Sequence, residues 1–284
     1  QNYPRIFDPI IVGLIEAGEA GGILSSVLER IALLLEEQNK LKGQITGALI
    51  YPVILLLLAL TVSLGLLIFI VPTFEELFDG LGAELPGLTQ FMLDLSRIVT
   101  SVNFIIISPI TIFLLLLFFK QYYSTNSGKL QIDSLILKLP LFGDLVLKSE
   151  LASLSDTFST LLNSGLPITE ALEKCIVSSS NQIIKNVIIK SIKLVKEGQL
   201  LSYSFSNSKF MPRLFISMIK IGEETGEMSF MIEKIANFYK REVDEAVSTL
   251  TKAMEPAVIF VVAAIVGTIV VALYLPMFSM LEKF

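Results

Sequence analysis

Residues 18–22, Gly-Glu-Ala-Gly-Gly, and residues 222–226, Gly-Glu-Glu-Thr-Gly, are two copies of one motif, 204 positions apart. The same offset of 204 aligns four further pairs without a gap: Ile31 with Ile235, Pro52 with Pro256, Pro72 with Pro276 and Phe74 with Phe278. A constant offset over such a distance indicates an internal duplication. Each copy leads into a long apolar segment, so each predicts a soluble helical piece joined to a membrane span.

The composition agrees with a membrane protein, because 53% of the residues are hydrophobic and only 17% are charged. Three windows contain no charged side chain: Gly43–Phe74, Ile98–Phe119 and Pro256–Leu281. A helix needs about 20 apolar residues to cross a bilayer core of about 30 Å. The sequence therefore predicts three transmembrane helices in an all-α protein.

Seven segments follow from this pattern. The predicted soluble parts are 1–47, the C-terminal part of a first helical-bundle domain, and 120–254, a second such domain. The predicted spans are 48–74, 100–119 and 255–278, with a short periplasmic loop at 75–99 and a periplasmic tail at 279–284. Residue 1 corresponds to residue 205 of the second copy, so we expect the first domain to be truncated at its N-terminus.

Basic residues set the expected orientation of the spans. Arg30, Lys40 and Lys42 precede the first span, and further lysines lie between the second and third spans. The loop between the first two spans carries one basic residue, Arg97, among five acidic ones. We therefore expect both soluble parts in the cytoplasm and the acidic loop outside.

Several classes of chemistry find little support in this chain. It contains no histidine and one cysteine, Cys175, and its net charge of -5 comes without a basic patch typical of nucleic-acid binding. Ser127-Gly128-Lys129 lacks the spacing of a phosphate-binding loop. We expect no enzyme activity, no catalytic residue, no metal site and no cofactor, so any ATP must be hydrolysed by another chain.

The repeated motif is the strongest candidate functional site. Gly18 and Gly222 are expected to close a helix in the left-handed conformation. Glu19 and Glu223 are then expected beside the positive N-terminus of the following helix. Gly22 and Gly226 complete the two motifs. Two interpretations of this motif remain open: it forms a purely structural turn, or it forms a turn that also contacts a partner protein.

Prolines mark the expected joints of the two long helices. Proline is tolerated in the first turn of a helix and otherwise kinks it. Pro52 and Pro256 lie where each soluble arm enters its span, and Pro109 predicts a kink in the second span. We expect Pro52 and Pro256 each to form a joint between the soluble part of its helix and the part that spans the membrane.

The spans carry a few hydroxyl and amide side chains, such as Thr61, Ser63 and Thr268, but no ionisable residue. Such groups are typical of helix–helix contacts. Transporters usually place charged side chains in their spans. The absence of ionisable residues therefore argues against a membrane transporter or permease subunit, which is kept as the alternative function. A membrane-bound enzyme is a further rival.

Residues 161–172, Leu-Leu-Asn-Ser-Gly-Leu-Pro-Ile-Thr-Glu-Ala-Leu, resemble the first motif of the type II secretion F / type IV pilus platform protein family. Gly165 and Pro167 are the residues of that motif. The two glycine–glutamate turns resemble the family's second motif, and Pro140-Leu141-Phe142-Gly143 also fits. The chain departs from the family at Ser153 and Asp156, where members often carry arginines.

The resemblance implies two cytoplasmic six-helix domains and three spans in the bacterial inner membrane. It also implies a platform protein that couples a cytoplasmic hexameric ATPase to pilins or pseudopilins. Other inner-membrane assembly proteins and further copies of the chain are the remaining partners it implies.

Overall fold

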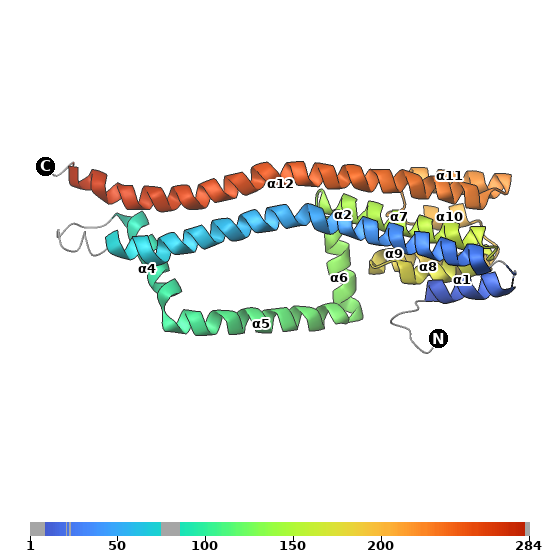
Figure 1. The fold of residues 1–284 in the computed structure, drawn as a ribbon, viewed down its shortest axis with the longest axis horizontal. Coiled ribbons are helices and arrows are strands. Elements are labelled where there is room, and N and C mark those ends of the chain that lie inside the picture. The colour runs from blue at the N-terminus through green and yellow to red at the C-terminus, as the bar shows by residue number, and fades with distance from the viewer. Residues whose placement is uncertain (1–8, 21, 23, 75–85, 282–284) are drawn as a thin grey trace. The chain divides into compact units, whose positions relative to one another are not determined.

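The computed structural model describes residues 9–20, 22, 24–74 and 86–281, and in this part of the chain it contains helices and no strand. Figure 1 shows these helices, coloured from blue at the N-terminus to red at the C-terminus. The first helices are α1 (Pro9–Ala20), α2 (Leu24–Gly65), the π-helix η1 (Leu66–Ile70), α4 (Gly87–Thr100), α5 (Val102–Ser124) and α6 (Asn126–Ile136). The others are α7 (Phe142–Asn163), α8 (Ile168–Ser178), α9 (Gln182–Lys196), α10 (Leu201–Ser206), α11 (Arg213–Thr225) and α12 (Met228–Leu281). The all-α prediction is confirmed.

Three helical segments are long and apolar enough to cross a membrane: Leu24–Phe74, Val102–Ser124 and Met228–Phe278. The three predicted spans are thereby confirmed as candidates. Helix α2 contains Pro52, α5 contains Pro109 and α12 contains Pro256, and none of these helices is interrupted there.

The chain divides into two compact units. The first comprises residues 1–46 and 123–250, and the second comprises residues 47–122 and 251–284. The soluble pieces of both sequence copies therefore contribute to one unit. The other unit holds the apolar segments.

The first unit is a bundle in which α8 packs on α7 and α9, α10 packs on α9 and α11, and α1 packs on α8. Aromatic side chains fill part of its core. The rings of Phe205 and Phe215 meet edge to face at 5.5 Å between centroids, a geometry that aromatic pairs prefer. Helix α9 buries Ile184, Ile188 and Ile192 on one face, as the spacing of its apolar residues predicts.

A tight turn precedes α7 and explains the Pro-Leu-Phe-Gly sequence. The amide of Phe142 donates to the carbonyl of Pro140 at 2.8 Å, and Leu141 has a positive φ of 65°. Such a γ-turn is rare and strained. A Cβ on Gly143 would lie 2.4 Å from the carbonyl oxygen of Leu137, so only glycine fits that position.

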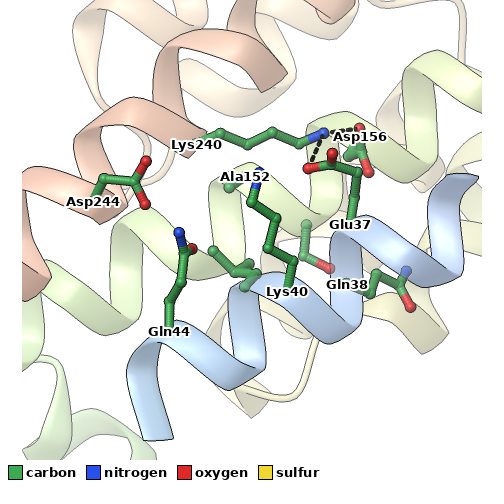
Figure 2. A pocket seen from close by; sticks show the side chains of 10 residues that line it. Glu37, Gln38, Lys40, Gln44, Ala152, Asp156, Lys240 and Asp244 are labelled. Carbon is green, nitrogen blue, oxygen red and sulfur yellow. Dashed lines mark hydrogen bonds and ion pairs between the residues drawn. The ribbon is translucent and has the colours of Figure 1, made fainter. Parts of the chain in front are cut away.

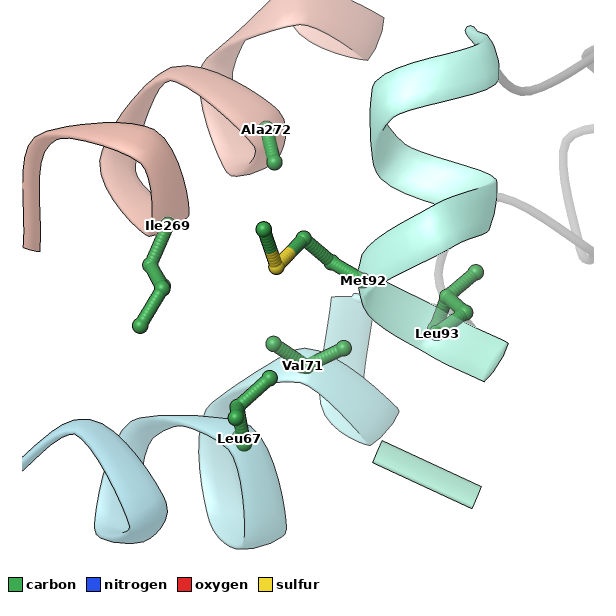
Figure 3. Packing of buried hydrophobic residues seen from close by; sticks show 6 residues of the cluster. All are labelled: Leu67, Val71, Met92, Leu93, Ile269 and Ala272. Atoms are coloured by element: carbon green, nitrogen blue, oxygen red, sulfur yellow. The ribbon is translucent and has the colours of Figure 1, made fainter. Parts of the chain in front are cut away.

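The second unit contains a helix that the sequence did not predict. Residues 87–100 form α4, within the segment assigned to a loop. Its apolar face buries Met92 and Leu93 against Leu67 and Val71 of the first span and Ile269 and Ala272 of the third. Figure 3 shows Met92 extending from α4 toward these side chains.

Two buried hydroxyl groups attach α4 to both spans. Ser96 donates to the carbonyl of Leu67 at 2.5 Å, and Thr89 donates to the carbonyl of Ala272 at 2.5 Å. Leu67 lies in η1, and π-helical turns leave backbone carbonyls without their usual partners. Helix α4 therefore joins the first and third spans through apolar packing and two polar contacts.

Three hydroxyl groups within the spans form hydrogen bonds inside their own helices. Thr61, Ser63 and Thr268 each donate to the carbonyl four residues earlier in their own helix. A helical hydroxyl satisfies its hydrogen bond in this way without a neighbour. The expectation of helix–helix contacts at these three residues stays a prediction.

Candidate functional site: the glycine turns and the buried carboxylates

The second glycine of each motif makes the turn. Gly226 ends α11 with φ 75° and ψ 2°, and Gly22 has φ 67° at the equivalent place. This left-handed conformation is the one that favours glycine at a helix end. The expectation that Gly18 and Gly222 close the helices was wrong, because α1 and α11 continue through them to Ala20 and Thr225.

Gly18 and Gly222 instead allow close packing of the next helix. A Cβ on Gly18 would lie 2.8 Å from Cγ2 of Val27, in α2. A Cβ on Gly222 would lie 3.1 Å from Cα of Met228, in α12. Gly18 and Gly222 therefore allow two successive helices to approach closely. Gly22 and Gly226 allow the chain to turn between those helices.

Glu223 caps a helix other than the one expected. Its carboxylate accepts the amide hydrogens of Leu201 at 2.5 Å and Ser202 at 3.1 Å, and the Ser202 hydroxyl at 2.5 Å. These amides belong to the first turn of α10, where backbone donors lack intrahelical partners. Glu223 was expected beside the N-terminus of the following helix, whereas its carboxylate lies at the N-terminus of α10, the preceding helix. The available signal was Leu200, the N-cap residue of α10, whose side chain cannot cap it.

Glu150 makes a second set of buried contacts with backbone amides, immediately before α9, and the sequence reasoning missed it. Its carboxylate accepts the amides of Ser180 at 3.1 Å and Asn181 at 3.0 Å, and the hydroxyl groups of Ser179 and Ser180. Glu150 is only 6% exposed. A lone glutamate before Leu151-Ala152, in an otherwise apolar helix face, was the signal that could have revealed it.

Glu19, the counterpart of Glu223, is exposed on α1. With the offset of 204, the counterparts of Leu201 and Ser202 fall before residue 1, so the contacts of Glu223 have no equivalent to compare in the first copy.

The Gly-x-Pro motif forms the turn between α7 and α8. Gly165 has φ 87°, and the amide of Leu166 donates to the carbonyl of Leu161 at 3.2 Å. Pro167 occupies the N-cap of α8. Its carbonyl accepts the amide of Ala171 at 2.9 Å, so the proline starts the helix.

Asp156 belongs to a cluster of charged residues. The ammonium of Lys240 lies 2.7 Å from Asp156 and 3.4 Å from Glu37. Figure 2 shows Lys240 extending from α12 to both carboxylates. Burial raises the pKa of Asp156, while the hydrogen bond from Lys240 opposes the increase. The cluster links α2, α7 and α12 within the first unit.

Pro52 is buried and Pro256 is exposed, each inside a continuous helix. The structure therefore brings the motif residues of each copy together in a turn, and it places the two prolines in the helices that follow those turns.

Comparison with known proteins identifies the family. The family model described as "Type II secretion system (T2SS), protein F" matches residues 1–72 and 154–276. The type IV pilus assembly protein PilC of Thermus thermophilus is 38% identical over 280 residues, which cover 98% of this chain and 68% of that protein.

Two further relatives show the same coverage. PilC of Pseudomonas aeruginosa is 37% identical over 282 residues, covering 99% of this chain and 75% of that protein. The type II secretion system protein F of Vibrio cholerae is 29% identical over 280 residues, covering 98% and 68%. The chain therefore belongs to the family of type II secretion system protein F and type IV pilus assembly protein PilC.

Proposed function

We propose that the chain is an inner-membrane platform protein of a type IV pilus or type II secretion machine. In this role it couples a cytoplasmic hexameric ATPase to the assembly of pilins or pseudopilins and is not itself an enzyme. The observation that carries the proposal is the pair of 51-residue helical segments, Leu24–Phe74 and Met228–Phe278. Each combines a polar arm with an apolar segment long enough to cross a membrane.

The length of these helices supports a mechanical role. At 1.5 Å per residue each extends about 75 Å, more than twice the thickness of a bilayer core. A continuous helix transmits a displacement of its polar arm to its apolar part. The glycine turns, with Gly18, Glu19 and Gly22 in one copy and Gly222, Glu223 and Gly226 in the other, form the start of each arm. Pro52 and Pro256 are the proposed joints.

The proposed topology has both soluble parts in the cytoplasm. The basic residues beside the spans support it, because such residues remain on the cytoplasmic side. The internal duplication also supports it, since two copies in the same orientation need one returning span between them. The two stretches matched by the family model end at residues 72 and 276, which differ by the repeat offset.

Helix α5 supports an oligomeric state. None of its residues is buried. It carries Asn103, Ser108 and Thr111 among apolar residues, and such groups favour helix–helix contacts inside a membrane. We propose that α5 contacts further copies of the chain or other inner-membrane assembly proteins.

Reversal of the Glu19 charge tests the coupling role. Glu223→Lys would remove a helix cap, so the test uses Glu19→Lys, with thermal unfolding to check that the variant is folded. Glu29→Lys, an exposed change on α2, is the matched control. We expect Glu19→Lys alone to reduce co-purification with the secretion ATPase and to reduce filament assembly, at equal protein level.

Normal filament assembly by Glu19→Lys would remove this residue from the mechanism. Failure of the unmodified chain to co-purify with such an ATPase, together with substrate uptake into proteoliposomes by the chain alone, would favour a transporter subunit instead.

A further inference from the structure

A groove with an apolar floor lies between α9 and the segment from α10 to Phe210, within the first unit. Its volume is about 350 Å³. We call it the α9–α10 groove, and its lining consists of Ile183, Asn186, Val187, Lys190, Leu194, Ser204, Asn207, Ser208, Lys209 and Phe210. The five residues from α9 recur at helical spacing, so they form one stripe along that helix.

The floor is apolar and incompletely covered. Ile183, Val187, Leu194 and Phe210 are each only half-buried. The amide of Phe210 donates to the hydroxyl of Ser208 at 3.2 Å, which fixes the turn that carries the ring. Half-buried apolar side chains in a recess gain stability when another apolar surface excludes water from them.

The rim is cationic. Lys190 and Lys209 are exposed, and none of the ten lining residues is acidic. No ion pair joins either lysine to another residue in the described part of the chain. The side-chain oxygen of Asn186 accepts from Gln182 at 3.2 Å, and its amide group still offers donors. The rim therefore favours a partner that presents hydrogen-bond acceptors, and carboxylates above all.

We propose that the α9–α10 groove binds an acidic amphipathic helix of a separate protein. The apolar side chains of that helix pack on the floor, and its carboxylates pair with Lys190 and Lys209. The stripe from Ile183 to Leu194 extends about 16 Å, which matches about three helical turns. In complexes of this kind, an amphipathic helix places apolar side chains that recur at helical spacing into a hydrophobic groove. Here the charged residues lie at the edges of the groove. The inference does not depend on the proposed coupling function.

A membrane surface fits the groove less well than a helix does. Proteins that lie on a bilayer insert protruding apolar side chains into it. The apolar residues here form the floor of a recess, which an outward ridge of side chains on a helix can fill. Charge complementarity and shape therefore both favour a protein segment.

Binding of a defined probe to the full chain in detergent micelles tests the proposal. The probe is a fluorescent synthetic helix of about four turns, with leucines on one face and glutamates flanking them. The groove variant is Lys190→Glu with Lys209→Glu. The matched control is Lys185→Glu with Lys193→Glu, which makes the same charge change on α9 outside the groove lining.

We expect the groove variant to weaken binding about tenfold, since two partly exposed ion pairs are lost. The control variant should leave the affinity nearly unchanged. A second probe with lysines in place of the glutamates should bind the groove variant more tightly than the original chain. Circular dichroism melting confirms that both variants are folded, and alanine at 190 and 209 replaces glutamate if they are not.

Equal weakening by the control variant would overturn the proposal, because attraction would then be unspecific. Absence of probe binding to the original chain would overturn it as well. If phosphatidylglycerol vesicles bound to the exposed soluble surface through Lys190 and Lys209 while the probe did not bind, the surface would recognise membrane rather than a helix.

Discussion

Two glutamates connect helices of the bundle through backbone amides. Glu223 in α11 caps α10 by accepting amides of its first turn, which have no intrahelical acceptor. Glu150 in α7 accepts the amides of Ser180 and Asn181 immediately before α9, and α9 itself is capped by the side chain of Asn181. The glutamate of the second repeat motif is therefore part of the fold as well as a candidate for coupling.

The cap made by Glu223 predicts a loss of stability on truncation. Glu223→Ala leaves the amides of Leu201 and Ser202 without their acceptor, and we expect it to lower the free energy of unfolding by about 1–3 kcal/mol. Glu224→Ala, on the neighbouring exposed residue, should cause a much smaller loss. Thermal unfolding in detergent measures both. Equal losses would contradict the role of Glu223 as a cap.

Gly143 is expected to be among the least replaceable glycines of the first unit. A Cβ there would meet the backbone oxygen of Leu137, which no side-chain rotation can move away. We therefore expect Gly143→Ala to lower the melting temperature clearly. Gly43→Ala is the control, because nothing lies near its Cβ position and alanine favours a helix by about 0.5–1 kcal/mol. A similar melting temperature for both variants would refute this explanation of the Pro-Leu-Phe-Gly turn.

Asp156 predicts a pH dependence of stability. Because its pKa is raised in the folded protein, folding favours the protonated carboxyl group. Its contribution is complete below the pKa of the unfolded chain, about 3.9, and is lost as pH rises through the folded value. The charged groups that contact it are Lys240 and, through Lys240, Glu37.

The comparison with Asp156→Asn isolates this contribution. The melting temperature of the original chain, relative to the variant, should decrease as pH rises from about 4. A relative melting temperature that increases over that range would show a lowered pKa and would contradict the assignment.

Helix α4 is the element that defines the outer packing of the spans. The sequence assigned its residues to a loop, because the segment lies between two spans and contains Asp94 and Arg97 among its apolar residues. Its stability comes from tertiary contacts, namely the apolar cluster and the hydroxyl groups of Thr89 and Ser96. A single sequence does not reveal such partners, whereas the long apolar windows reveal the spans directly.

The hydroxyl contacts of α4 can be removed separately from its packing. We expect Thr89→Val with Ser96→Ala to speed amide hydrogen exchange in residues 87–100 by at least about tenfold, since each bond contributes about 1 kcal/mol. Thr100→Val is the control, because that hydroxyl bonds only to carbonyls of its own helix. Unchanged exchange in the double variant would show that packing alone holds α4.

For whole helices, glycine and proline mark the ends of α8 and α9, since Gly165, Pro167 and Gly198 make local turns that depend on nearby residues. The roles of Gly18 and Gly222 were misassigned because close packing depends on the helix that follows. The backbone contacts of Glu150 and Glu223 were missed because their partners lie 21 to 31 residues away along the chain.

At the scale of the whole molecule, the account depends on two equivalent soluble pieces that lie on the same side of the membrane. The structure assigns both pieces to one compact unit. The charge pattern of the sequence predicts that this unit lies on the cytoplasmic side of the membrane. The proposed transmission of motion along α2 and α12 requires that topology.

Labelling of single cysteines with a membrane-impermeant maleimide tests this topology most directly. The native Cys175 does not interfere, because it is fully buried and burial raises the pKa of its thiol. Exposed positions for new cysteines are Glu16 in α1, Lys193 in α9 and Gln90 in α4. We predict that in intact spheroplasts the cysteine at 90 is labelled, while those at 16 and 193 react only after the membrane is permeabilised. Labelling of 16 and 193 from opposite sides of the membrane would contradict the account.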